Sequence, residues 1–485
     1  MSRITNILSK LKNIYIAFFA LILFCLSIMN ILKIHSKVYC IAGVVYVIGL
    51  IFLCFLAVKI KNRALFLVGI TFISFLTRLI WILVANTEPV LDFHLINHAA
   101  KLILEGSFSE LKQINYFNMW VYQLGFSSYC AFLYSAFSVN VFIVKLFNVF
   151  FSTGCVLLIY FISRKTFNEK AARISSLLYC IYIQSIIFNS LLTNQVISLF
   201  FIYLGLAIIL YKPNITGYIL SGISMAVGHI FRPEGSFMLY IVVFSILAYN
   251  GFSLIKNKRS FKDIKMKSLV PILSKIAILI ICFNMFVQLF GYSLRAVGIT
   301  DYEYKNRNTY WKFVLGLNAS TNGGYSNEDA KLLDEYPIGD LLYEKEMELI
   351  KERLSNKKQL VKLMCRKFSL MWSDNDSSIQ FISPGTGFND RELNYIVRLE
   401  KIQYTLIIIL SFLSILFVLA DKKKYNLSIY ILILLVSANW FVYLLIEIQT
   451  RYRYFIMPCL FILAGFGFYR ICCFESRDQM HLDKE

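Results

Sequence analysis

Long apolar runs separated by short polar stretches make up most of this chain. A helix needs roughly 20 apolar residues to cross the hydrocarbon core of a bilayer. Runs of about that length lie at 14–32, 38–58, 64–85, 139–162, 170–190, 193–211, 214–230, 235–250, 269–294, 400–420, 427–446 and 452–472. The pattern predicts an all-α polytopic membrane protein with about 12 transmembrane helices.

One further stretch, 119–137, is apolar, but Gln123, Gly125 and several serines interrupt it. Whether it spans decides the orientation of every later helix, and the lysine and arginine content of the loops discriminates between the two cases. If it does not span, the short loops and termini on one side hold 23 basic residues and those on the other side hold 7. We therefore expect an interfacial or re-entrant helix here, with both termini cytoplasmic.

Two segments on the outer side are longer than ordinary loops. Residues 86–138 form a first outer loop of amphipathic pieces, and residues 295–398 suffice for a small extracytoplasmic α or α/β domain. In the latter, Ser326 predicts a helix start, and charged helices are expected near 340–354 and 357–372.

The expected organisation follows from these segments. It comprises two extra N-terminal helices at 1–63, a core at 64–294, the outer domain at 295–398, three helices at 399–473 and a cytoplasmic tail at 474–485.

The charge of the chain fits an integral membrane protein. Lysine and arginine exceed aspartate and glutamate by 49 − 29 = 20, but segment 295–398 holds 15 of each sign and is neutral. The whole excess therefore lies elsewhere, chiefly in the short loops between spans, which is the positive-inside distribution rather than a basic nucleic-acid-binding face. No nucleic-acid partner is expected.

A dense polar cluster follows the third apolar run, in "NTEPVLDFHLINHAAKLILEG" at 86–106. Three interpretations of Asp92 compete. It could cap a helix that ends at Gly106. His94 and His98, at i and i+4, could instead belong to a zinc site, although Leu95 stands where a metalloprotease has its glutamate. Asp92 could also be a general base at the outer membrane surface, where a carboxylate is tolerated more easily than at mid-bilayer.

Basic residues at other outer span ends favour the third interpretation. Arg232, Arg451, Arg453 and Lys145 lie on the side where the orienting bias makes cations scarce, and Arg78 lies in the outer half of its span. Each of the first four alone could be an interfacial anchor, whereas Arg78, within its span, is harder to explain in that way. Several cations and one carboxylate at the same membrane face instead suggest that an anionic headgroup is bound there.

Several stretches in this order resemble those of bacterial glycosyltransferases of the GT-C type. The resemblance runs from about 65 to 470 through "LDFHLINHAAKLILEG", "YQLGFSSYCAFLYSAFSVNVFIVKLFN", "SLLTNQVISLFF", "GHIFRPEGSFMLY", "FVLGLNASTNGGYSNEDAKLL" and "RYRYFIMP". It is closest to family 39, with the dolichyl-phosphate-mannose:protein mannosyltransferases and the lipid A aminoarabinose transferases as relatives. A location in the bacterial plasma membrane is implied.

The resemblance implies a polyprenyl-phosphate sugar donor, an acceptor on the outer side (an envelope polymer, lipid or protein) and Asp92 as the catalytic base. It places Arg451 and Arg453 near the donor phosphate and Lys145 in the position of an arginine. Arg232 and Arg78 are further candidates for the phosphate. The candidates for binding the substrates are His94, Asn97, Tyr122, Gln123, Asn194, Gln195 and Glu234.

Two departures from the family pattern bear on metal dependence. Phe93 and Gln195 stand where the family often has acids. We therefore expect metal-independent, inverting transfer without a cofactor, with a divalent metal as the alternative. A secondary transporter or a noncatalytic envelope-assembly protein are the rival functions, although such a transporter usually has its long loop on the cytoplasmic side.

Overall fold

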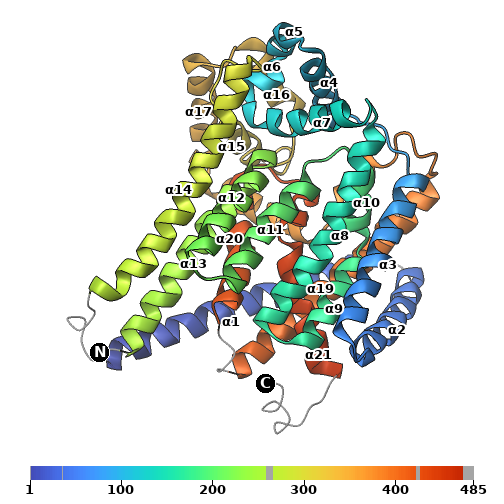
Figure 1. Cartoon of the computed structure of the whole chain (residues 1–485), viewed down its shortest axis with the longest axis vertical. Helices are drawn as coiled ribbons and strands as arrows, with labels where there is room; N and C mark the ends of the chain where they lie inside the picture. Colours follow the sequence, from blue (N-terminus) through green and yellow to red (C-terminus); the bar gives the residue numbers. More distant parts are fainter. Residues whose placement is uncertain (1, 35–36, 258–265, 422–425, 473–485) are drawn as a thin grey trace.

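The computed structural model describes residues 2–34, 37–257, 266–421 and 426–472, and in these ranges it is helical throughout (Figure 1). The only β-type pairing among these residues is a single bridge between Trp120 and Asn306. The expected tail at 474–485 lies outside the described residues.

Each of the 12 predicted runs coincides with a helix or a bent helix pair. They are α1 (Ser2–Leu32), α2 (Lys37–Lys59), α3 (Arg63–Val84), α8 (Val141–Thr166), α9 (Glu169–Cys180) with α10 (Ile183–Ile187), α11 (Gln195–Tyr211), α12 (Ile215–Phe231), α13 (Glu234–Asn257), α14 (Met266–Val297), α19 (Asp390–Ala420), α20 (Leu427–Leu445) and α21 (Met457–Cys472).

The chain is an all-α multi-pass membrane protein. Among the described residues, 7 helices are long and apolar enough to cross a membrane, or 8 if the pair around α9 and α10, bent by 59°, is one span. The apolar part of α2 and helices α11, α12 and α21 are shorter than that test requires. The full set of 12 spans therefore stays a prediction.

Asparagines define where many of the membrane helices begin. Asn62, Asn140, Asn168, Asn214 and Asn426 each accept a hydrogen bond from a backbone N–H in the first turn of the helix that follows. An N-cap of this kind satisfies one of the otherwise unpaired donors at a helix start. The polar residues between apolar runs thus set the helix boundaries.

Small residues let α21 approach its neighbours closely at the centre of the bundle. A Cβ on Gly465 would lie 2.1 Å from Ser175 Oγ of α9, and a Cβ on Gly467 would lie 2.1 Å from the carbonyl oxygen of Leu410 in α19. Membrane helices pack by such close contacts because apolar burial does not favour association in lipid.

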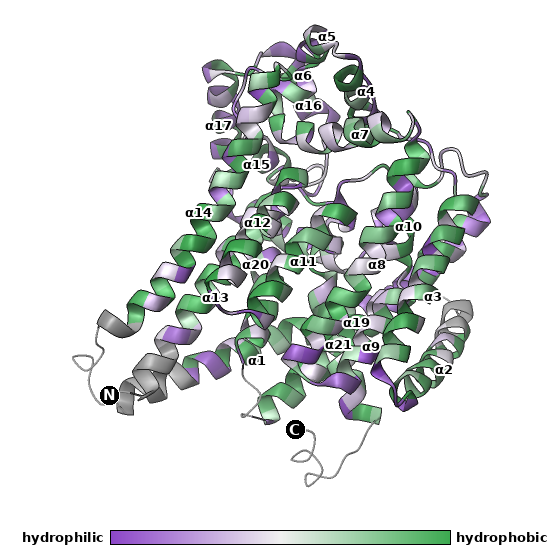
Figure 2. Cartoon of the chain, in the orientation of Figure 1, coloured by the Kyte–Doolittle hydropathy of each residue, from purple (hydrophilic) through white to green (hydrophobic). Residues whose placement is uncertain are grey.

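The polar and short helices are gathered at one end of the long helices, at the top of Figure 1. They are α4 (Asp92–Glu105), α5 (Phe108–Gln113), α6 (Asn115–Met119), η1 (Val121–Gln123), α7 (Leu124–Ala136), α15 (Trp311–Gly316), α16 (Asn327–Glu335), α17 (Asp340–Ser355) and α18 (Lys357–Ser373). Figure 2 shows the apolar residues along the long helices below them. The start of α1 and the end of α21 lie toward the opposite end (Figure 1).

The stretch 119–137 does not form a long helix. It contains η1 and the 13-residue α7, which lies across the ends of the long helices in Figure 1 and is not among the candidate spans. This arrangement is that of an interfacial helix.

The helices predicted within residues 295–398, called the outer segment after its expected side, are confirmed, and the last membrane-helix group begins inside this range. Ser326 accepts a hydrogen bond from the Asp329 amide and caps α16, while α17 and α18 cover the two charged stretches. However, α19 begins at Asp390, where Asn389 and Glu392 form a capping box, and continues into the membrane helix. The charged residues 390–398 thus extend a span instead of closing the outer domain.

Candidate active site

Asp92 is the first residue of α4 and its side chain is exposed. It has no hydrogen bond or ion pair with the part of the chain that the structure describes. The preceding Leu91 is the N-cap and has φ 51°, a backbone conformation that costs a non-glycine residue about 1–3 kcal/mol. Asp92 is therefore not the N-cap, although α4 does end at Gly106, in the left-handed conformation.

The loop that precedes Asp92 is fixed from three sides. Lys145 Nζ donates to the Thr87 carbonyl at 2.7 Å and to Asn86 Oδ1 at 3.4 Å. The Thr87 hydroxyl donates to the carbonyl of Ser190, and the Glu88 amide donates to the Pro384 carbonyl at 3.2 Å. Lys145, which is buried, therefore positions the loop that carries Asp92.

A chain of hydrogen bonds connects four of the predicted site residues beside this loop. Glu234 pairs with Arg232 at 2.8 Å, and Arg232 Nη1 donates to Asn194 Oδ1 at 3.1 Å. Asn194 Nδ2 donates to Gln123 Oε1 at 3.3 Å, and Gln123 Nε2 donates to the hydroxyl of Tyr116 at 3.0 Å. Segments far apart in the sequence thus meet in one polar network.

Electrostatic effects place Asp92 and two basic residues next to this network. Burial raises the pKa of Tyr116 well above its usual value, and the negative charge of Asp92 raises it further. Burial also raises the pKa of Tyr122 to about 12, although Lys312 and Arg232 lower it. The carboxylate, the two tyrosines and the two cations therefore share one neighbourhood at the end of the long helices where the polar helices gather.

Lys312 and Glu447 were not predicted to belong to the site. Lys312, in α15, forms an ion pair with Glu447, and Glu447 also accepts from Gln449 Nε2 at 2.8 Å. Tyr452 lies beneath Lys312, with Nζ 6.0 Å from the ring centroid. The sequence contains a sign that Glu447 is functional, because it is a lone acid at the end of an apolar run. Nothing in the sequence indicates that Lys312 is its partner.

Among the arginines predicted to bind the phosphate, the guanidinium of Arg451 has the fewest hydrogen bonds to the protein. It lies 4.4 Å from the ring centroid of Phe381 and 5.7 Å from that of Phe93, the residue after Asp92. Its Nε is buried without a hydrogen-bond partner. Gln195 contacts this residue only through the backbone, since its Nε2 donates to the Arg451 carbonyl at 3.5 Å.

Arg453 lies in the same short helix, η6 (Thr450–Phe455), but its partners are different. Its guanidinium is fully buried and donates to the carbonyls of Thr450 and Asp374, both at 3.0 Å. Asp376 Oδ2 is 3.5 Å away, and the ring centroid of Tyr404 is at 4.3 Å. The structure therefore directs Arg453 into the protein and not toward Asp92.

Arg78 is likewise bound by protein groups. It donates to Ser152 Oγ at 2.7 Å, to Ser185 Oγ at 2.9 Å and to the Cys180 carbonyl at 3.1 Å. Cys180 is the last residue of α9, at the bend. There the side chain of Gln403 accepts a hydrogen bond from the Ile183 amide and donates one to the Ile181 carbonyl. The arginine that could not be explained as a surface anchor thus satisfies backbone and hydroxyl groups at a broken helix.

The polar residues that follow Asp92 on α4 form no hydrogen bond with this network. Asn97 Oδ1 accepts from the hydroxyl of Tyr134 at 2.6 Å, and His98 is 3.8 Å from Glu110. His94 is exposed and forms no hydrogen bond or ion pair among the described residues. Within the described ranges, no group of three or more histidine, cysteine, aspartate or glutamate side chains is placed to hold a metal ion.

No protein-family model and no curated protein matches this chain. Among solved structures it is similar to the archaeal oligosaccharyltransferase AglB from Archaeoglobus fulgidus, solved with an inhibitory peptide and a dolichol-phosphate. The likeness has 12% sequence identity and a TM-score of 0.42, and covers 87% of this chain and 51% of AglB. This chain thus spans about half the length of that protein, and so low a score does not establish a shared fold.

Proposed function

We propose that this protein is a membrane glycosyltransferase that moves a sugar from a polyprenyl-phosphate donor to an acceptor hydroxyl at the outer ends of its helices. The observation that carries the proposal is the state of Asp92. It is an exposed carboxylate without a hydrogen-bond partner among the described residues, it follows a loop held by Lys145, and Arg451 lies against the ring of the next residue, Phe93. A carboxylate kept free at such a place is available to accept a proton.

Asp92 is the general base in this proposal. The acceptor hydroxyl gives its proton to the carboxylate while its oxygen attacks the anomeric carbon, and the bond from that carbon to the phosphate oxygen breaks. One displacement of this kind inverts the anomeric centre and needs no second carboxylate as nucleophile. The fixed loop contributes because it holds the base in place before the substrates bind.

Arg451 is the main ligand of the leaving phosphate, with Arg232 and Lys312 as further cations. Arg451 is only half-buried, and its guanidinium forms no hydrogen bond among the described residues, so its nitrogens can donate to phosphate oxygens in the planar, bidentate contacts that suit this group. Arg232 and Lys312 are each paired with a carboxylate and contribute a weaker field. Arg453, Arg78 and Lys145 support the site from within the protein instead of touching the donor.

The polar network provides groups that can orient the sugar. Tyr122, Gln123, Asn194 and Glu234 contribute hydroxyl, amide and carboxylate groups next to the cations, and such groups both donate to and accept from sugar hydroxyls. One oxygen of Glu234 is buried without a partner, which leaves an acceptor for a substrate hydroxyl.

The first test is Asp92→Asn in membranes from producing cells that contain their own radiolabelled lipid-linked sugars. We expect sugar transfer to fall about 100-fold or more, because a neutral amide cannot take the proton. Asp301→Asn is the matched control, since Asp301 is an exposed acid at the same end, paired with Lys112. Transfer that stays normal in the Asp92 variant, in protein of normal abundance, excludes Asp92 as the base.

The second test is Arg451→Gln, read by photo-crosslinking of the purified chain to a polyprenyl-phosphate probe. We expect at least about tenfold weaker crosslinking, because the main phosphate contact is lost. Arg366→Gln is the control, since Arg366 is exposed on the outer segment and only reaches Asn322 at 3.4 Å. Equal labelling of wild type and the Arg451 variant contradicts the assignment of the phosphate site.

A further inference from the structure

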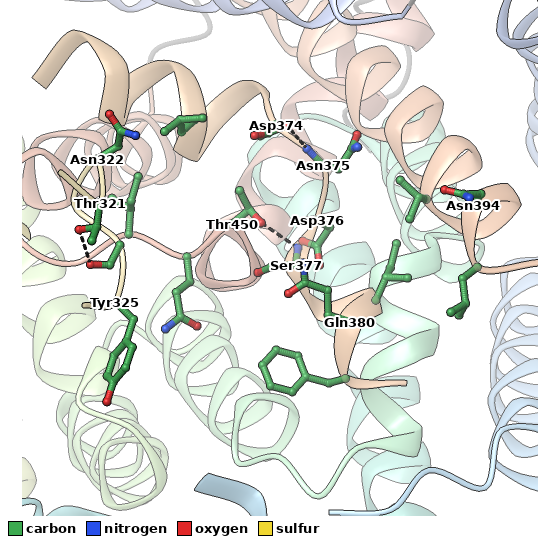
Figure 3. Close-up of a pocket in the computed structure, with 18 of the residues that line it drawn as sticks. Thr321, Asn322, Tyr325, Asp374, Asn375, Asp376, Ser377, Gln380, Asn394 and Thr450 are labelled. Carbon is green, nitrogen blue, oxygen red and sulfur yellow. Dashed lines mark hydrogen bonds between the residues drawn. The ribbon is translucent and has the colours of Figure 1, made fainter. Parts of the chain in front are cut away.

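An open cavity of about 850 Å³ lies between the outer segment and the ends of the last membrane helices (Figure 3). Its walls come from the turn before α16, the end of α18, η4 (Ser377–Phe381), the first turns of α19 and the start of η6. The volume is in the range of small-molecule binding sites.

The polar lining of this cavity consists of amides, hydroxyls and carboxylates. It includes Asp374, Asp376 and Asp390, and none of its lining residues is a lysine or an arginine. Cations lie behind the lining or at its edge: Arg453 contacts Asp376 at 3.5 Å and Lys33 approaches Asp374 at 3.9 Å, while Arg451 lies against the ring of Phe381 and Arg366 reaches Asn322. The wall that a ligand touches is therefore neutral to acidic.

Several lining side chains are left without protein partners. Tyr325, Asn375, Gln380 and Asn394 are exposed and, among the described residues, their side chains form no hydrogen bond. Figure 3 shows all four around the cavity. Amides and a phenol that are free to donate and accept, with an aromatic face beside them, suit a molecule rich in hydroxyl groups.

One wall of the cavity lies close to the residue that follows Asp92. Phe381 lines it, and the Phe381 ring centroid is 5.5 Å from that of Phe93, next to Asp92. Arg451 lies against both rings. Tyr325, on the opposite wall, is close enough to Asp92 and Glu447 for their negative charges to raise its pKa, after the larger effect of burial.

We propose that this cavity binds the acceptor, and that the acceptor is a hydroxyl-rich molecule without negative charge, either a neutral glycan or one that carries amino groups. The inference rests on the proposed function and narrows it, because a polyanionic acceptor would have to lie against carboxylates with no lining cation to balance it. The donor phosphate and the acceptor then occupy separate, neighbouring places, at Arg451 and in this cavity, with Asp92 close to both.

The charge preference is tested with Asn394→Cys in the purified full-length chain, with Cys25, Cys365, Cys472 and Cys473 replaced by serine. A cationic methanethiosulfonate reagent is expected to react at least about tenfold faster than an anionic reagent of similar size. Gln359→Cys is the matched control, because Gln359 lines a second pocket together with Lys358, Lys362 and Arg366. The anionic reagent should react faster than the cationic one there. An anionic reagent that reacts equally fast or faster at position 394 overturns the proposal.

The role of the cavity is tested with Asn394→Trp, which fills it from an exposed position on α19, and with Gln359→Trp as the control. We expect transfer to fall at least tenfold, while crosslinking to the polyprenyl-phosphate probe stays within twofold of wild type. Normal transfer overturns the proposal, and so does a parallel loss of crosslinking, because the cavity would then serve the donor. If Asp92→Asn is inactive while Asn394→Trp is active, the proposed function survives and this inference fails.

Discussion

Individual charged side chains at the outer end of this protein differ mainly in what they contact. Arg451 has a free Nε and Asp92 has no partner among the described residues, whereas Arg453 is bound from several sides. Glu346, in α17, is a different case. It is fully buried, and neither carboxylate oxygen has a clear hydrogen-bond partner. Burying an unpaired carboxylate disfavours its charged form.

Glu346 should make the stability of the outer segment depend on pH. Burial raises its pKa from 4.5 to about 7, and Asn308 offsets only part of this effect. Because the folded-state pKa is the higher one, the stabilisation is complete below pH 4.5 and is lost as pH rises through 7. We expect the outer segment to be about 2–3 kcal/mol less stable at pH 8 than at pH 5. Glu346→Gln should remove this difference.

Hydrogen exchange of α17 at the two pH values measures this effect. Glu348→Gln is the control, because Glu348 is exposed and pairs with Lys345 at 2.9 Å. A pH dependence that is unchanged in Glu346→Gln and lost in Glu348→Gln would refute the interpretation.

At the scale of elements, close helix packing and one broken helix distinguish the bundle from a set of independent spans. The run 170–190 was predicted as one helix, but the chain bends by 59° between α9 and α10. Arg78 and Gln403 bond the backbone groups that the break leaves free. Side chains from α3 and α19 thus make the break possible, and no local signal in the run itself predicts it.

Gly467→Leu should disrupt the bundle more than a glycine change on a lipid-facing surface. Its Cβ would meet the Leu410 carbonyl, which is part of the α19 backbone and cannot rotate away. We expect the folded state to lose about 3 kcal/mol of stability or more, which would be measured as a lower midpoint of thermal unfolding in detergent. Gly69→Leu is the control, because nothing lies within 4 Å of its Cβ position. Equal midpoints for the two variants would show that α21 can move away from α19.

At the scale of the whole molecule, the outer segment is docked on the membrane helices and does not form a separate lid. Lys367 is buried and donates to the carbonyls of Gly316, Leu444 and Ile446 at 2.6–2.8 Å. The Glu447 amide also donates to the Lys312 carbonyl at 2.9 Å. These contacts tie the segment directly to the ends of the membrane helices.

The ion pair between Lys312 and Glu447 should stabilise this junction. Lys312→Met leaves the buried Glu447 carboxylate unpaired, and we expect a cost of about 2 kcal/mol, less than the 3–5 of a fully buried pair because Lys312 is partly exposed. Limited proteolysis of segment 298–389 reports the change. The loss of stability in the double variant Lys312→Met with Glu447→Gln should be smaller than the sum of the losses in the two single variants. Strict additivity would mean that the pair does not hold the segment.

The sequence by itself determined the class of the protein and the places of most of its helices. Apolar runs, capping asparagines and the Ser326 turn act within a few residues, so they can be recognised locally. The tertiary structure alone decided which polar residues meet. It separated Arg451 from Arg453, two residues apart, and joined Lys312 to Glu447, because partners are chosen by helix packing between segments distant in the chain.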